Sequence, residues 1–298
     1  MSGEWVYFLQ LTMAGIMVGL LYAIIAIGFV LIFKATGILN FAQGEIMLIA
    51  GFVCYALVVN FNLPVWVAFI GMIFITAMIG LAVERIVLRP MIGEPIFAVI
   101  MITVGLSILL RSLIGIIFGH ENYAFPSPFA TEPLSFGGFS LSQADVLIIA
   151  CSLMLIALFF LFFKYSKMGL AMRATANDQA TSALMGISVK RIFALTWSVS
   201  FATCSVGGFF LINTMALNFE ISAVALCAFP AIVLGGLESI PGAIVGGLII
   251  GLIENYSGGY LAQYFTGDIK DVMPFVFLFI VLIIKPYGLF GTKDIERV

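Results

Sequence analysis

Polar side chains interrupt an apolar stretch near the start of the chain. Asn40, Gln43 and Glu45 lie within TGILNFAQGEIMLIAG, residues 36–51. A carboxylate inside a membrane is unfavourable unless it faces a cavity or a partner, so one interpretation is a broken helix that lines a transport pathway. The other is a helix that begins at the membrane interface, with Asn40 as its N-cap and Glu45 in the first turn, where the helix dipole favours negative charge.

A further charged residue, Arg111, lies in the middle of the apolar run TVGLSILLRSLIGIIFG. One interpretation makes it a cation of a pathway or the partner of a buried acid such as Glu254. The other is a structural arginine that extends to the nearer interface or forms a local ion pair. The sequence leaves both interpretations open.

The remaining residues do not form the patterns of soluble enzymes. The sequence contains no GxxxxGKS/T phosphate loop and no HExxH, CxxC or GxSxG motif. Its only histidine is His120, and its four cysteines, Cys54, Cys151, Cys204 and Cys227, all lie in apolar runs, where they act as small hydrophobic residues. We therefore predict neither an enzyme with a catalytic cluster nor a metal site.

The composition is that of a protein embedded in lipid. Of 298 residues, 63% are hydrophobic and 9% are charged, whereas soluble domains carry about 25% charged residues. The net charge of −2 gives no indication of nucleic-acid binding. Because a span needs roughly 20 apolar residues, we predict an all-α polytopic membrane protein, a bundle of about eight or nine transmembrane helices with broken or re-entrant segments, in a single domain over residues 1–298. The expected spans are Val6–Phe33, Phe41–Val59, Pro64–Val83, Ile96–Phe118, Asp145–Phe163, Ile192–Ile212, two shorter pieces near 221–236 and 242–256, and Val272–Ile284.

Positive charge is concentrated in one polar segment, KYSKMGLAMRATANDQATSALMGISVKR at 164–191, which holds five of the thirteen Lys and Arg residues. Cytoplasmic loops retain positive charge, so we place this segment in the cytoplasm. Alternating the spans from there puts eleven of the thirteen cations inside and the polar segment 119–144 outside. The N-terminus is then outside and the C-terminus inside, with nine crossings, whereas a version with eight would reverse one end.

Glycines four residues apart indicate close helix packing, because they let helix backbones approach each other in lipid. Such pairs occur at Gly15/Gly19, Gly115/Gly119, Gly242/Gly246 and Gly247/Gly251. The stretch FPAIVLGGLESIPGAIVGGLIIGLIEN at 229–255 is also rich in helix-breaking residues, with Ser239 as a capping residue. It fits either two half-helices that meet at a break inside the membrane or a tight cytoplasmic helical hairpin.

Three stretches together resemble the permeases of branched-chain amino acid ABC importers. They are GLLYAIIAIGFVLIFKATGILNFAQGEIMLIAG, MGLAMRATANDQATSALMGISVKR and FPAIVLGGLESIPGAIVGGLIIGLIE. The resemblance covers about residues 10–285 and is closer to the H-type subunit than to the M-type subunit. The chain departs from the family at Glu238, where many members have a small residue, and at Arg111 and Ser112, where many have an amide pair.

The resemblance implies a permease subunit of an ATP-driven importer in the bacterial inner membrane, which translocates branched-chain or similar hydrophobic amino acids by alternating access. It implies several partners besides lipid: a second permease (an M-type paralogue or another copy of this chain), two cytoplasmic ATPases and a periplasmic binding protein. The chain itself would hold no cofactor, since the ATPases would bind ATP. Two alternatives stay open: a permease for urea or short amides in the same family, and a self-contained, ion-coupled secondary transporter.

The resemblance also assigns a pathway through the membrane. The family segments that match 37–45 and 229–247 lie in the membrane core. The residues expected to line the pathway are Asn40, Gln43, Glu45, Gly235, Gly236, Ser239 and Pro241.

The family segment that matches 169–187 is a coupling segment that docks on the ATPase. Here the sequence predicts a short helix, Gln179–Met185, which Asp178 caps and Gly186 ends in the left-handed conformation. Ser188 is expected to cap the helix that follows. Small and apolar residues share one face of the short helix, and charged residues form its rim. The expected interface consists of Arg173, Asp178, Ala180, Ala183, Leu184, Met185, Gly186 and Ile187.

Overall fold

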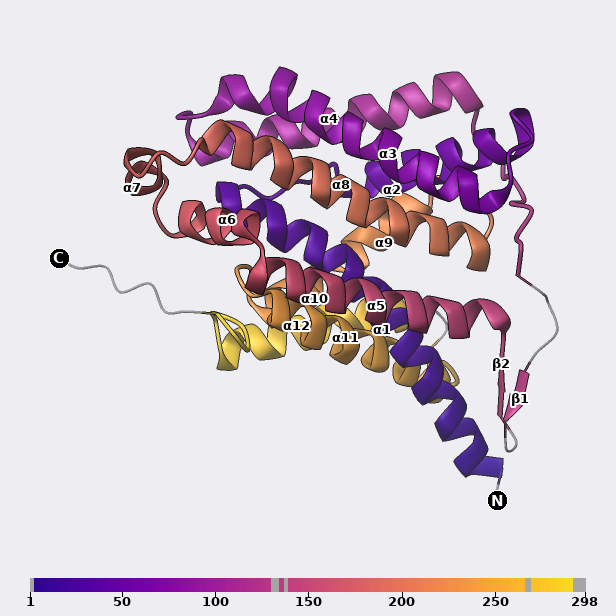
Figure 1. The fold of residues 1–298 in the computed structure, drawn as a ribbon. Helices are drawn as coiled ribbons and strands as arrows, with labels where there is room; N and C mark the ends of the chain where they lie inside the picture. Colours follow the sequence, from indigo (N-terminus) through magenta and orange to yellow (C-terminus); the bar gives the residue numbers. More distant parts are fainter. Residues whose placement is uncertain (1–2, 130–133, 137–138, 266–268, 292–298) are drawn as a thin grey trace. The chain divides into compact units, whose positions relative to one another are not determined.

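The structure is a computed structural model that describes residues 3–129, 134–136, 139–265 and 269–291 (Figure 1). Within these residues it is mostly helical, as the composition predicts. The longer helices are α1 (Gly3–Thr36), α2 (Gln43–Tyr55), α3 (Val65–Val83), α4 (Ile96–Phe118), α5 (Gln143–Tyr165), α8 (Val189–Thr214), α11 (Ile240–Tyr260) and α12 (Ile269–Ile284). The shorter elements are α6 (Lys167–Asn177), α7 (Gln179–Leu184), α9 (Ile221–Cys227), α10 (Phe229–Gly235) and an antiparallel hairpin of β1 (Leu134–Phe136) and β2 (Phe139–Leu141).

Seven helical stretches among the described residues are long and apolar enough to cross a membrane. Two of them include π-helical turns, at 56–60 after α2 and at 84–88 after α3. The shorter apolar stretch Ile221–Gly235 and the 16-residue α12 complete the series. Every span predicted from the sequence thus corresponds to helix, but the piece predicted at 242–256 is longer than expected, because α11 has 21 residues.

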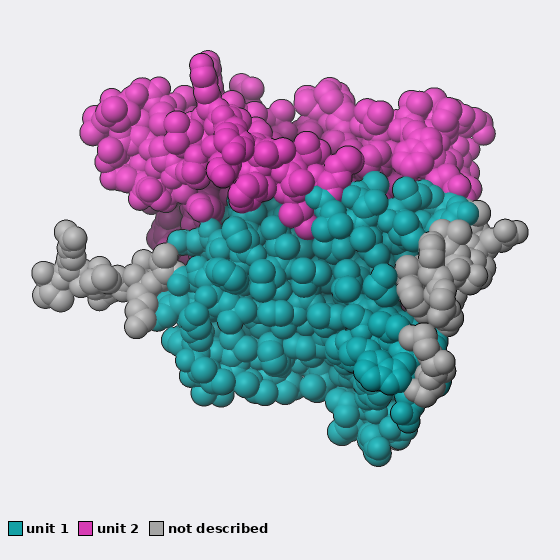
Figure 2. All heavy atoms as spheres, turned by 60° about the horizontal axis from the view of Figure 1, so that its bottom comes forward, with its two compact units in different colours: residues 1–30, 129–153, 226–298 teal, residues 31–128, 154–225 magenta. Residues whose placement is uncertain are grey.

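The chain divides into two compact units, which Figure 2 shows in different colours. Unit 1 comprises residues 1–30, 129–153 and 226–298, and unit 2 comprises residues 31–128 and 154–225. Both α1 and α5 begin in unit 1 and end in unit 2. Each unit is therefore assembled from segments that are distant in the sequence.

Glycines bring the backbones of α1 and α11 into contact within unit 1. A Cβ atom on Gly251 would lie 2.3 Å from the backbone nitrogen of Gly19, and one on Gly247 would lie 2.7 Å from the Gly19 carbonyl oxygen. A Cβ on Gly15 would lie 3.2 Å from the carbonyl oxygen of Gly251. The prediction that these two glycine pairs serve helix packing is therefore confirmed.

The other two glycine pairs have different surroundings. Cβ atoms on Gly242 and Gly246 would each lie 2.1 Å from a carbonyl oxygen of α10, so this pair also packs two helices together. The prediction for Gly115/Gly119 is wrong. Gly115 makes room for the imidazole of His120, and Gly119, with φ of 81°, ends α4 in a conformation that favours glycine.

In unit 2, α8 packs closely against both α2 and α3. A Cβ on Gly80 of α3 would lie 2.7 Å from the carbonyl oxygen of Trp197, and one on Gly208 would lie 2.6 Å from that of Met47. The Trp197 side chain is almost fully buried. Spacing alone does not reveal these glycines, because neither has a second glycine four residues away on its own helix.

We predict that Gly19→Leu destabilises the protein much more than Gly105→Leu. Leucine at position 19 must push α1 away from α11, and overpacking of this kind costs roughly 1–3 kcal/mol or more. Gly105 on α4 has no atom within 4 Å of the place where its Cβ would be, so it is the matched control. Thermal unfolding of the purified variants in detergent measures the effect. Equal unfolding midpoints would contradict the glycine contact.

Candidate functional site

The chain between α1 and α2 is not helical, although it lies beside a membrane-spanning helix. Gly37, with φ of 71°, turns the chain out of α1. The Thr103 hydroxyl on α4 then accepts from the N–H of Phe41 at 3.4 Å. Its own proton lies within reach of two carbonyls, that of Ile100 at 2.8 Å and that of Leu39 at 3.3 Å. Thr103 is about 10 Å along α4 from its first residue. Irregular backbone at this depth requires protein or water partners, and Thr103 supplies them.

Two buried amides hold the start of α2. The Asn40 side-chain amide donates to Gln43 Oε1 at 2.8 Å, and Asn40 Oδ1 accepts from the N–H of Ala42 at 3.1 Å. The Gln43 amide donates to the Ser200 hydroxyl at 3.0 Å and to the sulfur of Cys204. Asn40 and Gln43 are 1% and 0% exposed, so in this conformation both are turned to protein partners.

The proposed cap of α2 needs a correction. The N-cap position is Ala42, not Asn40, although the Asn40 side chain still accepts a backbone hydrogen bond there. The sequence did not single out Thr103, Ser200 or Cys204. Their only signal is a small polar side chain on an apolar helix, which is too common in membrane proteins to identify a partner.

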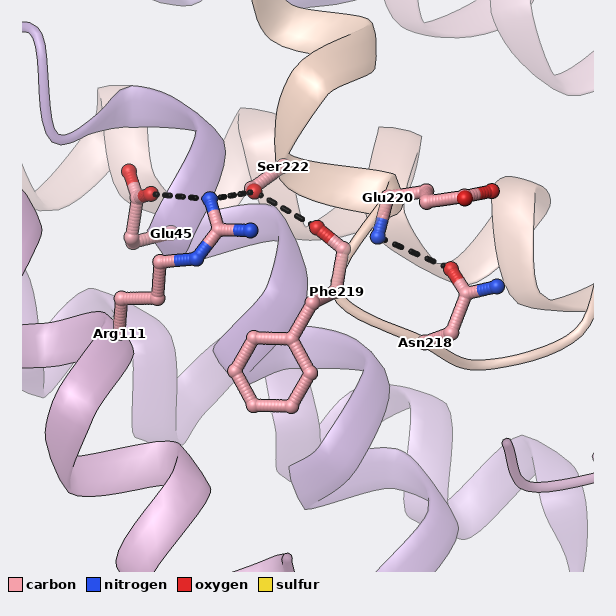
Figure 3. A network of polar contacts seen from close by, with 6 residues as sticks. All are labelled: Glu45, Arg111, Asn218, Phe219, Glu220 and Ser222. Carbon is pink, nitrogen blue, oxygen red and sulfur yellow. Dashed lines mark hydrogen bonds and ion pairs between the residues drawn. The ribbon is translucent and has the colours of Figure 1, made fainter. Parts of the chain in front are cut away.

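Glu45 and Arg111 form a polar cluster with α9 (Figure 3). One terminal nitrogen of Arg111, Nη1, lies 3.8 Å from Glu45 Oε1 and donates to the hydroxyl of Ser222 at 3.2 Å. That hydroxyl donates to the carbonyl of Phe219 at 2.9 Å, and the guanidinium carbon lies 5.6 Å from the centre of the Phe219 ring. The Glu45 side chain is 7% exposed, whereas that of Arg111 is 51% exposed.

Glu254 has a partner within its own unit. Its carboxylate accepts a hydrogen bond from the Tyr22 hydroxyl at 2.5 Å, within unit 1. Arg111 belongs to unit 2 and pairs there with Glu45. Arg111 is thus the partner of a buried acid, Glu45, and the pathway and the purely structural interpretations of this arginine both stay open.

The break after α10 is a tight turn between two contacting helices of unit 1. Gly236, with φ of 99°, ends α10, and the Ser239 hydroxyl accepts from the N–H of Gly242 at 3.0 Å to cap α11. Pro241 lies in the first turn of α11. A Cβ on Gly235 would lie 2.2 Å from the carbonyl oxygen of Gly242. The arrangement is that of a helical hairpin, in which the short α10 packs against the full-length α11.

The remaining carbonyls of α10 are satisfied by the chain that follows α12. The N–H of Leu289 donates to the carbonyl of Leu234 at 2.7 Å, and that of Phe290 donates to Gly235 at 3.2 Å. Four of the residues predicted for the pathway therefore lie at a turn of unit 1 whose backbone groups are hydrogen-bonded. They are Gly235, Gly236, Ser239 and Pro241. The three near α2 lie in unit 2. Their role in a pathway stays a prediction.

The segment between α5 and α8 folds into two short helices with side-chain caps. Ser166 accepts from the N–H of Gly169 to cap α6, and Asp178 accepts from the N–H of Thr181 to cap α7. Hydrogen bonds from the Thr181 hydroxyl, and then from its N–H, lower the pKa of the Asp178 carboxyl. The ionised cap is therefore retained as the pH falls, until the pH passes this lowered pKa.

The end of α7 matches the predicted stop. The helix ends at Leu184, and Gly186 follows with φ of 85°. The N–H of Ile187 then donates to the Ser182 carbonyl at 3.0 Å, which turns the chain back toward α8. Ser188 occupies the N-cap position of α8, but the prediction that its side chain caps the helix is wrong, because the side chain makes no such hydrogen bond.

Most residues predicted for the ATPase interface are exposed. Leu184 and Met185 are 87% and 80% exposed. The half-buried residue of the set is Ile187, and the exposed ones are Arg173, Asp178, Ala180, Ala183, Leu184, Met185 and Gly186. The α7 surface therefore presents two large apolar side chains and two small ones.

A pocket of about 220 Å³ lies beside α7 in unit 2. Its wall includes Gln179, the side chain of Trp197, and the ion pair in which Arg89 binds Glu84 with two hydrogen bonds, at 2.9 and 3.2 Å. The pocket shows that α7 and the charged segment 84–94 lie at the same end of unit 2. This agrees with the prediction that the basic segments share one side of the membrane.

The model of the family described as "branched-chain amino acid transport system / permease component" matches residues 11–282. The chain belongs to this family. It is 34% identical over the full length of both chains to the "high-affinity branched-chain amino acid transport system permease protein LivH" of Salmonella typhimurium. It is 31% identical, over 99% of both chains, to the corresponding permease protein BraD of Pseudomonas aeruginosa.

The fold agrees with this membership. The solved structure of "PsaBC from Streptococcus pneumoniae in complex with Fab" aligns with a TM-score of 0.52 and 16% identity, covering 94% of this chain and 92% of the other. This likeness concerns the fold. The permease is a multi-pass protein of the inner membrane, and the prediction of a polytopic helical permease is confirmed.

We predict that Gln43→Leu destabilises the permease. The substitution removes the acceptor of the buried Asn40 amide, and a buried polar group without its partner costs about 1–3 kcal/mol. The matched control is Gln263→Leu, at an exposed position of unit 1. Thermal unfolding of both variants in detergent measures the difference. Unchanged stability of Gln43→Leu would show that the amide pair does not hold the start of α2.

The sidedness of the permease is tested by single cysteines at Ser127 and Ala180, after the four native cysteines are replaced by alanine. Both positions are exposed, whereas Ser182 on the same helix as Ala180 is 4% exposed and unsuitable. We expect a membrane-impermeant maleimide to label Ser127→Cys in intact cells and Ala180→Cys only after the membrane is opened. Labelling of Ala180→Cys in intact cells would show that the permease has the opposite orientation in the membrane.

Proposed function

We propose that this permease is one membrane subunit of an ATP-driven importer for branched-chain or similar hydrophobic amino acids. Membership of the permease family over residues 11–282 is the observation that carries the proposal. The relatives from S. typhimurium and P. aeruginosa are both named as permeases for branched-chain amino acids. Because the sequence contains no GxxxxGKS/T phosphate loop, we assign ATP binding to separate ATPase subunits.

The importer would contain several chains besides this one. We include a second permease subunit, either an M-type paralogue or another copy of this chain, two cytoplasmic ATPases and a periplasmic binding protein. The binding protein would deliver the amino acid to the side of the 119–144 segment. Closure of the ATPases on ATP would then move the coupling segments and switch the pathway from outward-facing to inward-facing.

The exposed surface of α7 supports its role as the contact with an ATPase. Leu184 and Met185 extend into solvent at the end of a helix of six residues, and such apolar side chains are favoured where they enter a partner. Ala180 and Ala183 lie three residues apart on the same face and allow a partner to approach the helix closely. Arg173 and Asp178 flank this face, where charges orient a partner more than they add affinity.

We predict that Ala183→Arg separates the permease from its ATPases. An arginine on the contact face adds a bulky charge that the partner cannot accept without losing its packing. ATP-dependent leucine uptake in proteoliposomes should fall by about tenfold or more, and co-purification of the ATPases should decrease in parallel. The control is Gln263→Arg, which adds the same charge at an exposed position outside both α7 and the 119–144 segment and should leave both readouts unchanged.

Two outcomes would contradict the proposal. Full co-purification together with unchanged uptake in Ala183→Arg would remove α7 from the coupling step. Ion-driven leucine uptake by the purified permease without any ATPase would instead identify a secondary transporter.

A further inference from the structure

Arg111 lies inside a membrane-spanning helix and is still half exposed. It precedes the last residue of α4 by seven residues, about 10 Å along the helix axis. Its exposed neighbours on α4 include the apolar Ile108 and Leu113 as well as the polar Ser112. A guanidinium that faces lipid inside a spanning helix is unfavourable, even where it extends toward the nearer interface. A polar counterpart for the exposed part of Arg111 would remove this cost in the working protein.

The guanidinium also has unused hydrogen-bonding capacity. Its contacts with Glu45 and Ser222 both use Nη1, and neither Nε nor Nη2 has a hydrogen-bond partner among the residues that the structure describes. The distance of 3.8 Å to Glu45 is longer than a hydrogen bond, so charge attraction rather than a short contact joins the two groups. Arg111 can thus accept a second anionic partner without first breaking a tight pair.

The surrounding residues fix this arrangement. A Cβ on Gly44 would lie 2.3 Å from the Ser222 carbonyl oxygen, so α2 and α9 are in backbone contact next to Glu45. Ser222 is itself held by the Phe219 carbonyl, and the Phe219 ring lies beside the guanidinium (Figure 3). The His120 ring stacks on the Phe219 ring, and the two ring centres are 4.7 Å apart. The two charges are therefore presented at fixed positions.

We propose that Arg111 and Glu45 form a subsite for an amino acid zwitterion, with Arg111 binding the α-carboxylate and Glu45 binding the α-ammonium group. This inference rests on the proposed function and names the residues that recognise its substrate within the membrane. A carboxylate matches the two free nitrogens of a guanidinium in a bidentate contact. A zwitterion brings both charges, so each protein charge stays neutralised while the ligand is bound. Urea and short amides lack both charges.

A purely structural ion pair predicts a different response to mutation. Replacing both charges of a buried pair by neutral groups is often neutral or stabilising, whereas removing only one leaves an unpaired charge. The double variant Glu45→Gln with Arg111→Gln therefore separates the two cases. It keeps side chains of similar size and polarity but removes both charges that a zwitterion would use.

The test uses the complete importer in proteoliposomes, with leucine as the probe. We expect Arg111→Gln, Glu45→Gln and the double variant each to lower ATP-dependent leucine uptake by about tenfold. Subunit assembly and basal ATP hydrolysis should be kept in the double variant, which leaves no unpaired charge. Arg111→Lys keeps the charge but loses the bidentate geometry, and we expect it to lower uptake less than Arg111→Gln. Glu4→Gln also removes a charge, but at an exposed position of α1 outside this cluster, so it is the control and should retain the uptake.

The possible failures are distinguishable. Wild-type uptake in the double variant would overturn the subsite and leave the proposed function intact. Failure of the double variant to assemble would assign the pair a structural role and would also overturn the subsite. Absence of ATP-dependent leucine uptake by the wild-type importer would overturn the proposed function and this inference together.

Discussion

The need to satisfy every backbone polar group inside lipid governs this structure. Most of the chain meets it with helices, but the segment 37–42 and the turn after α10 cannot do so by themselves. The Thr103 hydroxyl and the buried side chain of Asn40 supply partners for the first. Ser239 and the chain that follows α12 supply them for the second. Irregular backbone is thus found where other parts of the same unit provide hydrogen bonds.

Contact between helix backbones is the second constraint. In lipid the hydrophobic effect does not drive helices together, so packing depends on how closely they approach. Gly19 and Gly251 permit that approach in unit 1, and Gly80 and Gly208 permit it in unit 2. The same kind of contact at Gly44 holds α9 beside Glu45. The charged cluster therefore depends on a glycine that carries no charge itself.

The functional groups fall into two kinds of surroundings. Asn40, Gln43 and Glu45 are buried and held by neighbours whose positions are fixed by packing. The α7 surface is exposed, short and capped at its start, which suits a contact that forms with another chain. In the importer proposed above, both kinds would be used, the buried groups inside the membrane and the α7 surface at the contact with an ATPase.

The sequence by itself determined the features that depend on neighbouring residues. It predicted α4 as Ile96–Phe118, the cap at Asp178 and the left-handed Gly186, because apolar length, a cap and a positive φ are local properties. Resemblance to a known family supplied the permease function. Tertiary structure decided which groups meet: Arg111 pairs with Glu45, Glu254 pairs with Tyr22, and Gly115 makes room for His120 rather than a helix. Spacing along one helix shows which face a residue occupies. The residue that it contacts on a neighbouring helix is determined by how distant segments of the chain pack.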